Sequence, residues 1–125
     1  IDLHKRAEIH DQSMLETPET EIFAFFPSFI DDSKPMSGEY ISFLGGYEEG
    51  IRHHYENNSH HPEHYKNGIT DMNLLDIIEM LCDWKARLKE GETIEEKIKE
   101  YKKKYGLSND LVKILLNTVN LLDRK

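Results

Sequence analysis

Two segments decide the fold and the search for a site: HHYENNSHHPEHY at residues 53–65 and LLDIIEMLCDWKA at residues 74–86. In the second segment apolar residues recur at spacings of three and four, which predicts a helix from Met72 to Lys89. The residues expected on its apolar side are Leu74, Leu75, Ile78, Leu81, Cys82 and Leu88.

Helices are predicted on both sides of these segments. Downstream, Thr93 opens a helix that stops at Gly106, and Ser108 caps a last helix. One face of that helix carries Leu111, Ile114, Leu115, Val119 and Leu122. Upstream, helices are expected over 2–12, from Thr17-Pro18 to Pro27, and over 38–57, and Pro62 starts one turn in the loop 57–71. We therefore expect one all-α domain over residues 1–125, a bundle of about five to seven helices.

Charge and composition exclude several classes of protein. The formal charge of −8 argues against a nucleic-acid polymer as partner, since lysines gather only in KIKEYKKKY at residues 97–105. No apolar run approaches the roughly 18 residues that span a bilayer. The single cysteine, Cys82, excludes an internal disulfide and favours a reducing, cytoplasmic location. We expect its thiol to lie in the core.

The histidine-rich segment suggests a metal site, because histidine is the commonest protein ligand of transition metals. His54 falls on the inward stripe of the predicted helix 38–57, whereas His53 is rotated about 100° away. A short loop then brings His60 or His61 beside His54, while His64 is expected to be an outer residue. A histidine on an apolar stripe is also compatible with a simple core residue.

Another stripe of the predicted helix 72–89 carries three acidic residues, Asp76, Glu79 and Asp83. For Asp76 we favour a solvated acidic face. Asp83 lies between Cys82 and Trp84 in the apolar run, where a carboxylate is costly to bury without a cation or donors, so we interpret it as a metal ligand. Glu79, one turn earlier, is expected to contact a ligand rather than the ion.

A His10-Asp11 dipeptide lies at the end of the first predicted helix. Adjacent residues diverge on a helix, so the two can bind one ion only where the backbone geometry helps. The arrangement is known from HD-domain metal hydrolases. The segments IHDQS, HHYENNSHHPEHY and IIEMLCDWKA resemble those of a family of uncharacterised bacterial and phage proteins, which is similar to the HD superfamily of all-α phosphohydrolases. The similarity runs from Leu3 to about Leu88.

This resemblance implies a role for each matching residue. His10 and Asp11 match the His-Asp pair, in which the aspartate can bridge two metals. His54, His60 and His61 match histidines that hold a second metal, and Asp83 matches the aspartate that closes the first site. The sequence departs from the pattern in two places. Met14 replaces a lysine that could hold a phosphate, and the superfamily's first histidine is missing, since His4 lies on another face of the first helix. We therefore expect that an N-terminal helix is absent.

The leading hypothesis is a metal-dependent phosphohydrolase that acts on a nucleotide or another phosphate ester. The resemblance makes Asp11 and His54 the candidate catalytic residues. The ligand set has oxygen and nitrogen donors without thiolate, which favours one or two manganese, iron or magnesium ions. Lys85 and Arg87 are candidate phosphate contacts or solvent-facing helix charges. The alternatives are a non-catalytic metal- or nucleotide-binding module, and a homo-oligomeric scaffold that uses the hairpin 94–122.

Overall fold

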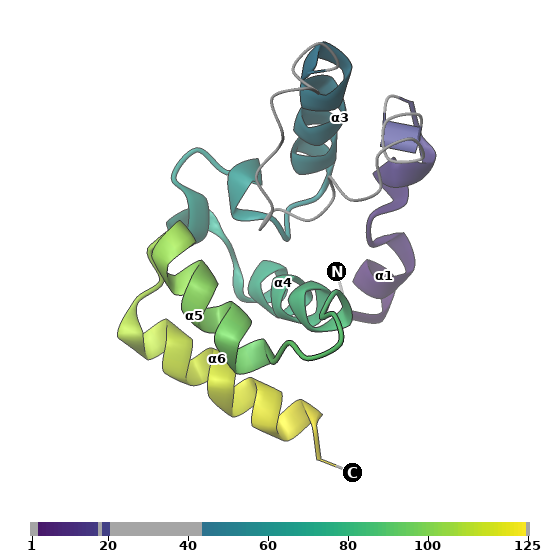
Figure 1. Ribbon diagram of the computed structural model, residues 1–125. Coiled ribbons are helices and arrows are strands. Elements are labelled where there is room, and N and C mark those ends of the chain that lie inside the picture. The colour runs from purple at the N-terminus through teal and green to yellow at the C-terminus, as the bar shows by residue number, and fades with distance from the viewer. Residues whose placement is uncertain (1–2, 18, 21–43, 125) are drawn as a thin grey trace. The chain divides into compact units, whose positions relative to one another are not determined.

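The computed structural model describes residues 3–17, 19–20 and 44–124, in which every regular element is a helix (Figure 1). The chain divides into two compact units, Ile1–Ser59 and His60–Lys125. The all-α prediction is confirmed for these residues, and the single domain stays a prediction. No helix among them is long and apolar enough to cross a membrane.

The N-terminal unit contains α1 (Leu3–Ile9), the 3-10 helix η1 (Gln12–Leu15) and α3 (Leu44–Asn57). The first helix was predicted to reach residue 12, but it ends at Ile9 because Asp11 takes a left-handed conformation. Helix α3 packs against η1. Asn58 fastens this contact, since its side-chain amide donates to Ser13 Oγ at 2.7 Å and to the His54 carbonyl at 2.8 Å.

Part of the upstream prediction lies outside the described residues. Glu19 and Thr20 are helical, as expected after Thr17-Pro18, but the apolar run that follows and the loop 31–37 are not described. The described part of the helix expected over 38–57 begins at Leu44.

The C-terminal unit begins with two 3-10 turns, η4 (Pro62–His64) and η5 (Gly68–Asp71), of which the first was predicted from Pro62. Helices α4 (Leu74–Ala86), α5 (Ile94–Tyr105) and α6 (Asn109–Leu122) follow. Helix α5 contacts both α4 and α6. The core that they enclose consists of Met80, Leu81, Trp84, Ile94, Ile98, Tyr101, Leu107, Leu115 and Val119.

Local caps set the ends of these helices. The side chains of Thr93 and Ser108 accept hydrogen bonds from backbone N–H groups three residues later, as predicted. Gly106 ends α5 with φ 66°, a conformation that favours glycine. At the start of α4, Asn73 and Asp76 form a reciprocal capping box.

Two predictions for α4 are wrong. Asp76 is fully buried rather than solvated, because it completes the capping box and its Oδ2 accepts a hydrogen bond from the Tyr65 hydroxyl at 2.5 Å. Cys82 is exposed rather than in the core. The face of α4 that packs is centred on Met80 and Trp84, and this rotation also leaves Leu74 75% exposed.

The apolar face predicted for α6 is divided. Leu115 and Val119 are buried, whereas Ile114 and Leu122 are exposed. The apolar residues of α6 span too wide an arc for one neighbouring helix to cover, so only the side toward α5 is buried.

Candidate functional site

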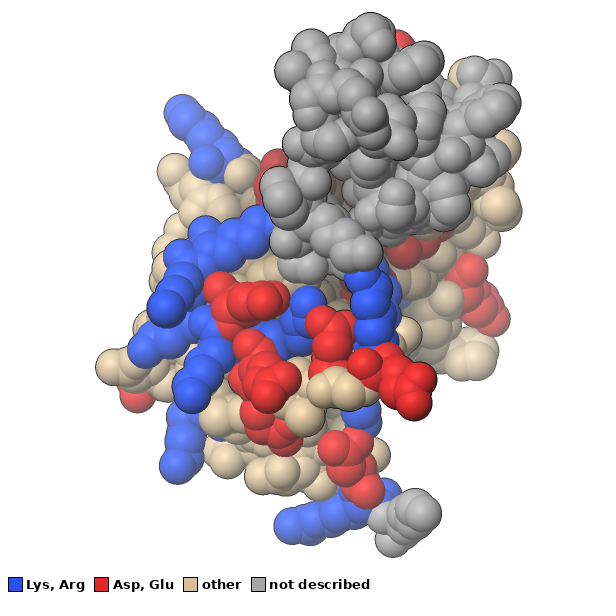
Figure 2. Space-filling model, in the orientation of Figure 1, with Lys and Arg blue, Asp and Glu red and all other residues tan. Residues whose placement is uncertain are grey.

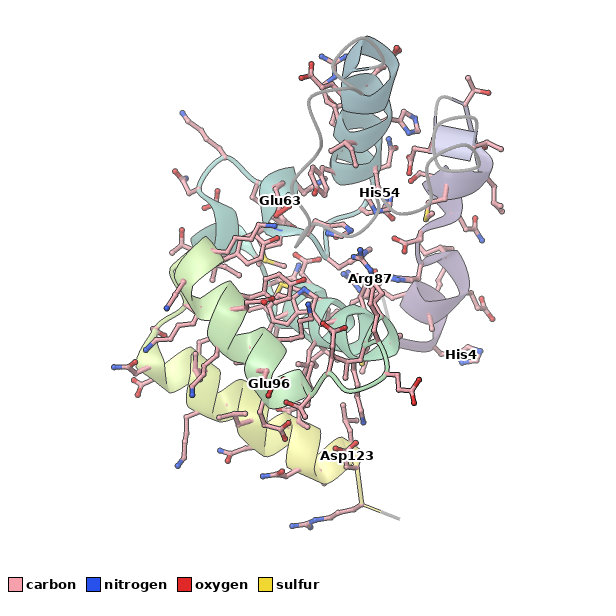
Figure 3. The ribbon with its side chains drawn as sticks, in the orientation of Figure 1. His4, His54, Glu63, Arg87, Glu96 and Asp123 are labelled. Carbon is pink, nitrogen blue, oxygen red and sulfur yellow. The ribbon has the colours of Figure 1, made fainter. Side chains whose placement is uncertain are left out.

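A buried carboxylate orients two histidine rings in the N-terminal unit. Glu19 is fully buried, and its two oxygens accept hydrogen bonds from His53 Nδ1 at 2.5 Å and His54 Nδ1 at 2.6 Å. The two rings leave α3 at adjacent positions, and Figure 3 labels His54 among the side chains of this unit. Because a buried carboxylate is costly without donors, Glu19 and the two rings fix one another.

The second ring nitrogen of His54 points to another carboxylate. His54 Nε2 lies 3.6 Å from Asp11 Oδ1. With Nδ1 donating to Glu19, a neutral His54 ring carries its lone pair on Nε2, which is the form that binds a metal. Two ligand atoms that each lie roughly 2.0–2.2 Å from one ion are at most about 4.4 Å apart. The separation of 3.6 Å therefore fits two ligands of one ion.

The His10-Asp11 dipeptide lies in a turn rather than within a helix. Asp11 has φ 55° and ψ 21°, and it is the non-glycine residue with positive φ in the described part of the chain. This conformation is uncommon outside glycine, although aspartate tolerates it better than most residues. It allows adjacent side chains to converge, with His10 Nε2 3.2 Å from Asp11 Oδ2. The turn at Asp11 therefore brings together two adjacent side chains that would diverge on a helix.

The C-terminal unit holds a second histidine between two carboxylates. His60 is fully buried, and its Nδ1 lies 2.7 Å from Glu79 Oε2. On the other side of the ring, Nε2 lies 3.9 Å from Asp83 Oδ2, again within the range for two ligands of one ion. The His61 ring is also buried, and its centroid lies 4.2 Å from that of His60. Glu79 thus contacts His60, one of the candidate ligands.

The two cations that follow Asp83 differ in their surroundings. Asp83 is buried, and Arg87 Nη1 lies 3.7 Å from its Oδ2, one helical turn along the chain. Arg87, labelled in Figure 3, therefore offsets part of the charge on this carboxylate. Lys85 pairs instead with Asp123, at the end of α6.

Within each unit the structure brings predicted residues together: His10, Asp11 and His54 in one, and His60, His61, Glu79, Asp83 and Arg87 in the other. Sequence reasoning missed Glu19, because an acidic residue after a proline reads as part of an ordinary first helical turn. Asn58, which lies four residues after His54, holds η1 through Ser13 Oγ.

Comparison with known proteins gives a family whose function is unknown. A model described as "Family of unknown function (DUF5662)" matches residues 1–121, so the chain belongs to that family. No curated protein and no solved structure matches the chain.

Proposed function

We propose that the chain binds one or two divalent metal ions and hydrolyses a phosphate ester, such as a nucleotide. The proposed ligands are His10, Asp11, His54, His60, His61 and Asp83. One observation carries the proposal. In each unit a buried histidine has one carboxylate at Nδ1 and a second carboxylate 3.6 or 3.9 Å from Nε2. The resemblance to HD-domain phosphohydrolases supports the same residues.

The donors are imidazole nitrogens and carboxylate oxygens, which suit manganese, iron or magnesium. A bound ion of this kind would lower the pKa of a water molecule and polarise the phosphate. Asp11 has two carboxylate oxygens, one facing His10 and one facing His54, and we assign it the orientation of the attacking water. Glu19 keeps the Nε2 lone pair of His54 directed at that position. Arg87 is the candidate contact for the phosphate.

The two groups of ligands are close in the sequence. Helix α3, which carries His54, ends at Asn57, and His60 is the first residue of the C-terminal unit. Each unit therefore contributes three of the six proposed ligands.

One observation favours the alternative, a non-catalytic module that binds metal or a nucleotide. Lys85, one of the two cations suggested for the phosphate, is engaged with Asp123. Met14 also stands where the similar sequences have a lysine. Metal binding is common to both functions, and hydrolysis separates them.

Metal binding is tested on the full chain by elemental analysis and by calorimetric titration with Mn²⁺. Asp11→Asn and Asp83→Asn each remove one proposed ligand charge, and Asp123→Asn, at an exposed carboxylate, is the matched control. We expect at least a tenfold weaker affinity in the first two variants and no change in the control. If both ligand groups hold the same ion, either variant abolishes its binding; if they hold separate ions, each variant retains one. Unchanged affinity in both variants contradicts the proposed site.

Hydrolysis is tested with a panel of nucleotides and a generic phosphodiester, with Mn²⁺ and with a chelator. The enzyme hypothesis predicts turnover that depends on Mn²⁺ and falls in Asp11→Asn. Tight metal binding without turnover on any substrate of the panel supports the non-catalytic module. A circular dichroism spectrum of each variant confirms that the helices remain.

A further inference from the structure

Helix α6 has an outer apolar face that its own unit leaves uncovered. Leu115 and Val119 point into the core, whereas Ile114 is 56% and Leu121 is 62% exposed. The neighbouring helix α5 differs, because its outer surface carries acidic and basic groups together. Figure 2 shows red acidic groups and blue basic groups side by side on this face of the molecule. A shallow depression on α5 is lined by Glu96, Lys99, Glu100 and Lys103.

Four residues of α6, two exposed and two half-buried, follow the spacing of a coiled-coil seam. Leu111, Ile114, Thr118 and Leu121, here called the outer seam, recur at intervals of three, four and three residues. This is the a/d pattern by which two helices pack along their length. Leu111 and Thr118 are half-buried, so the seam is partly shielded at its a positions and open at its d positions.

Charges flank the seam in a self-complementary order. Asp110, Asn117 and Arg124 occupy the equivalent positions beside it, seven residues apart. Helix α6 ends at Leu122, and Asp123 and Arg124 form a turn directly after it, in which the Arg124 N–H donates to the Leu121 carbonyl. Asp110 therefore lies at one end of the seam and Arg124 at the other, roughly 21 Å apart at 1.5 Å per residue.

We propose that α6 pairs with α6 of a second copy of the chain in the antiparallel direction, along the outer seam. In this direction Asp110 of each copy meets Arg124 of the other, and the two Asn117 side chains meet near the two-fold axis. The parallel direction would bring like charges to the same end and align the two helix dipoles unfavourably. A single surface that is complementary to itself is what a two-fold dimer requires.

The dimer formed in this way is weak and reversible. A seam about 21 Å long between two single helices buries less surface than a standard interface, in which each partner buries about 800 Å². We therefore expect a dissociation constant of about 10–100 μM, and association that weakens as salt screens the end charges. The pairing is independent of the proposed metal chemistry.

Sedimentation equilibrium of the full chain from 10 μM to 1 mM tests the proposal. The wild-type protein is expected to approach the dimer mass at about the upper end of this range. Leu121→Lys places a charge on the seam and should leave a monomer throughout. Leu74→Lys, at a residue of α4 that is 75% exposed, is the matched control and should dimerise as the wild type does. A wild-type monomer at 1 mM, or a dimer in Leu121→Lys, overturns the proposal.

A charge exchange tests the antiparallel direction. Asp110→Arg and Arg124→Asp should each weaken the dimer about tenfold by placing like charges together. The double variant should restore the wild-type affinity. The restoration cannot come from a more stable monomer, because both changes place the wrong sign of charge at the ends of the α6 dipole. Failure of the double variant to regain affinity overturns the antiparallel arrangement.

Discussion

Tyr65→Phe removes one hydrogen bond to a buried carboxylate, which holds the segment after His61 to α4. The Tyr65 hydroxyl donates to Asp76 Oδ2 at 2.5 Å, and Asp76 is fully buried. The same oxygen accepts the Asn73 N–H at 3.2 Å, and the Asn73 side chain accepts the Asp76 N–H at 2.8 Å. The substitution keeps the ring and both capping contacts but removes the hydroxyl donor.

The size of the effect follows from the charge of the acceptor. A hydrogen bond to an ionised group contributes about 1.5–3 kcal/mol, and the buried carboxylate loses one of its donors. We therefore expect the free energy of unfolding to fall by about 1.5–3 kcal/mol. For a chain of this size, at roughly 4 °C per kcal/mol, Tm should fall by about 6–12 °C.

Urea denaturation followed by circular dichroism measures this loss. Tyr105→Phe is the matched control in the same unit, because the Tyr105 hydroxyl lies 3.5 Å from Glu63 Oε2 in exposed surroundings. There the expected loss is below about 0.5 kcal/mol. If Tyr65→Phe costs no more than Tyr105→Phe, the Asp76 contact does not hold this segment and the reasoning is wrong.

Three further predictions concern the surface of the C-terminal unit. Exposed Cys82 should react with a maleimide in the native protein, as mass spectrometry would show; reaction only in denaturant would contradict it. The Lys89 N–H and the Lys97 ammonium lower the pKa of Glu92 from 4.5. The ionised Glu92 carboxylate therefore stabilises the fold above pH 4.5, and this contribution is lost as the pH falls through the lowered pKa. Urea denaturation curves of Glu92→Gln and of the wild type should differ at neutral pH and converge in acid. Lys85→Met removes the exposed ion pair with Asp123. The free energy of unfolding measured in urea should fall by at most about 1 kcal/mol, and the Mn²⁺ affinity measured by calorimetry should stay unchanged.

The helix ends of the C-terminal unit were predictable because their signals are local. Thr93, Gly106 and Ser108 set the backbone within a few residues of themselves, so no knowledge of tertiary contacts was needed. The orientation of α4 was not predictable in the same way. Apolar residues lie around most of that helix, and which of them pack depends on where α5 lies. This is why Cys82 was assigned to the wrong side.

Asp76 shows a second limit of sequence reasoning. Its position in an acidic stripe suggested solvent, but a buried carboxylate is stable where donors surround it. Those donors are the Tyr65 hydroxyl, which lies eleven residues away, and the Asn73 N–H. Periodicity reports the direction of a side chain along its own helix and says nothing of such partners.

The candidate ligands were predicted more fully than the residues that orient them. Histidine and aspartate in a recognisable order mark a possible site, whereas Glu19 becomes meaningful only when its oxygens are seen at His53 and His54. Asp11 is intermediate: the dipeptide was recognised, but its left-handed backbone, which brings it to His10, comes from the structure.

Arg87 offers a way to separate a metal ligand from an ordinary ion pair at Asp83. The same oxygen, Asp83 Oδ2, lies 3.9 Å from His60 Nε2 and 3.7 Å from the guanidinium of Arg87. A cation bound there would be repelled by Arg87, so Arg87→Gln should tighten Mn²⁺ binding about tenfold, which corresponds to about 1.4 kcal/mol of screened repulsion.

If Arg87 also contacts the phosphate, the same variant should bind Mn²⁺ more tightly and yet hydrolyse more slowly. Calorimetry and turnover assays would therefore move in opposite directions. A purely structural pair predicts a different result, in which Arg87→Gln lowers stability through the buried carboxylate and leaves Mn²⁺ affinity unchanged. That result would remove Asp83 from the proposed ligands, because an oxygen that binds a divalent ion must respond to the loss of a neighbouring positive charge.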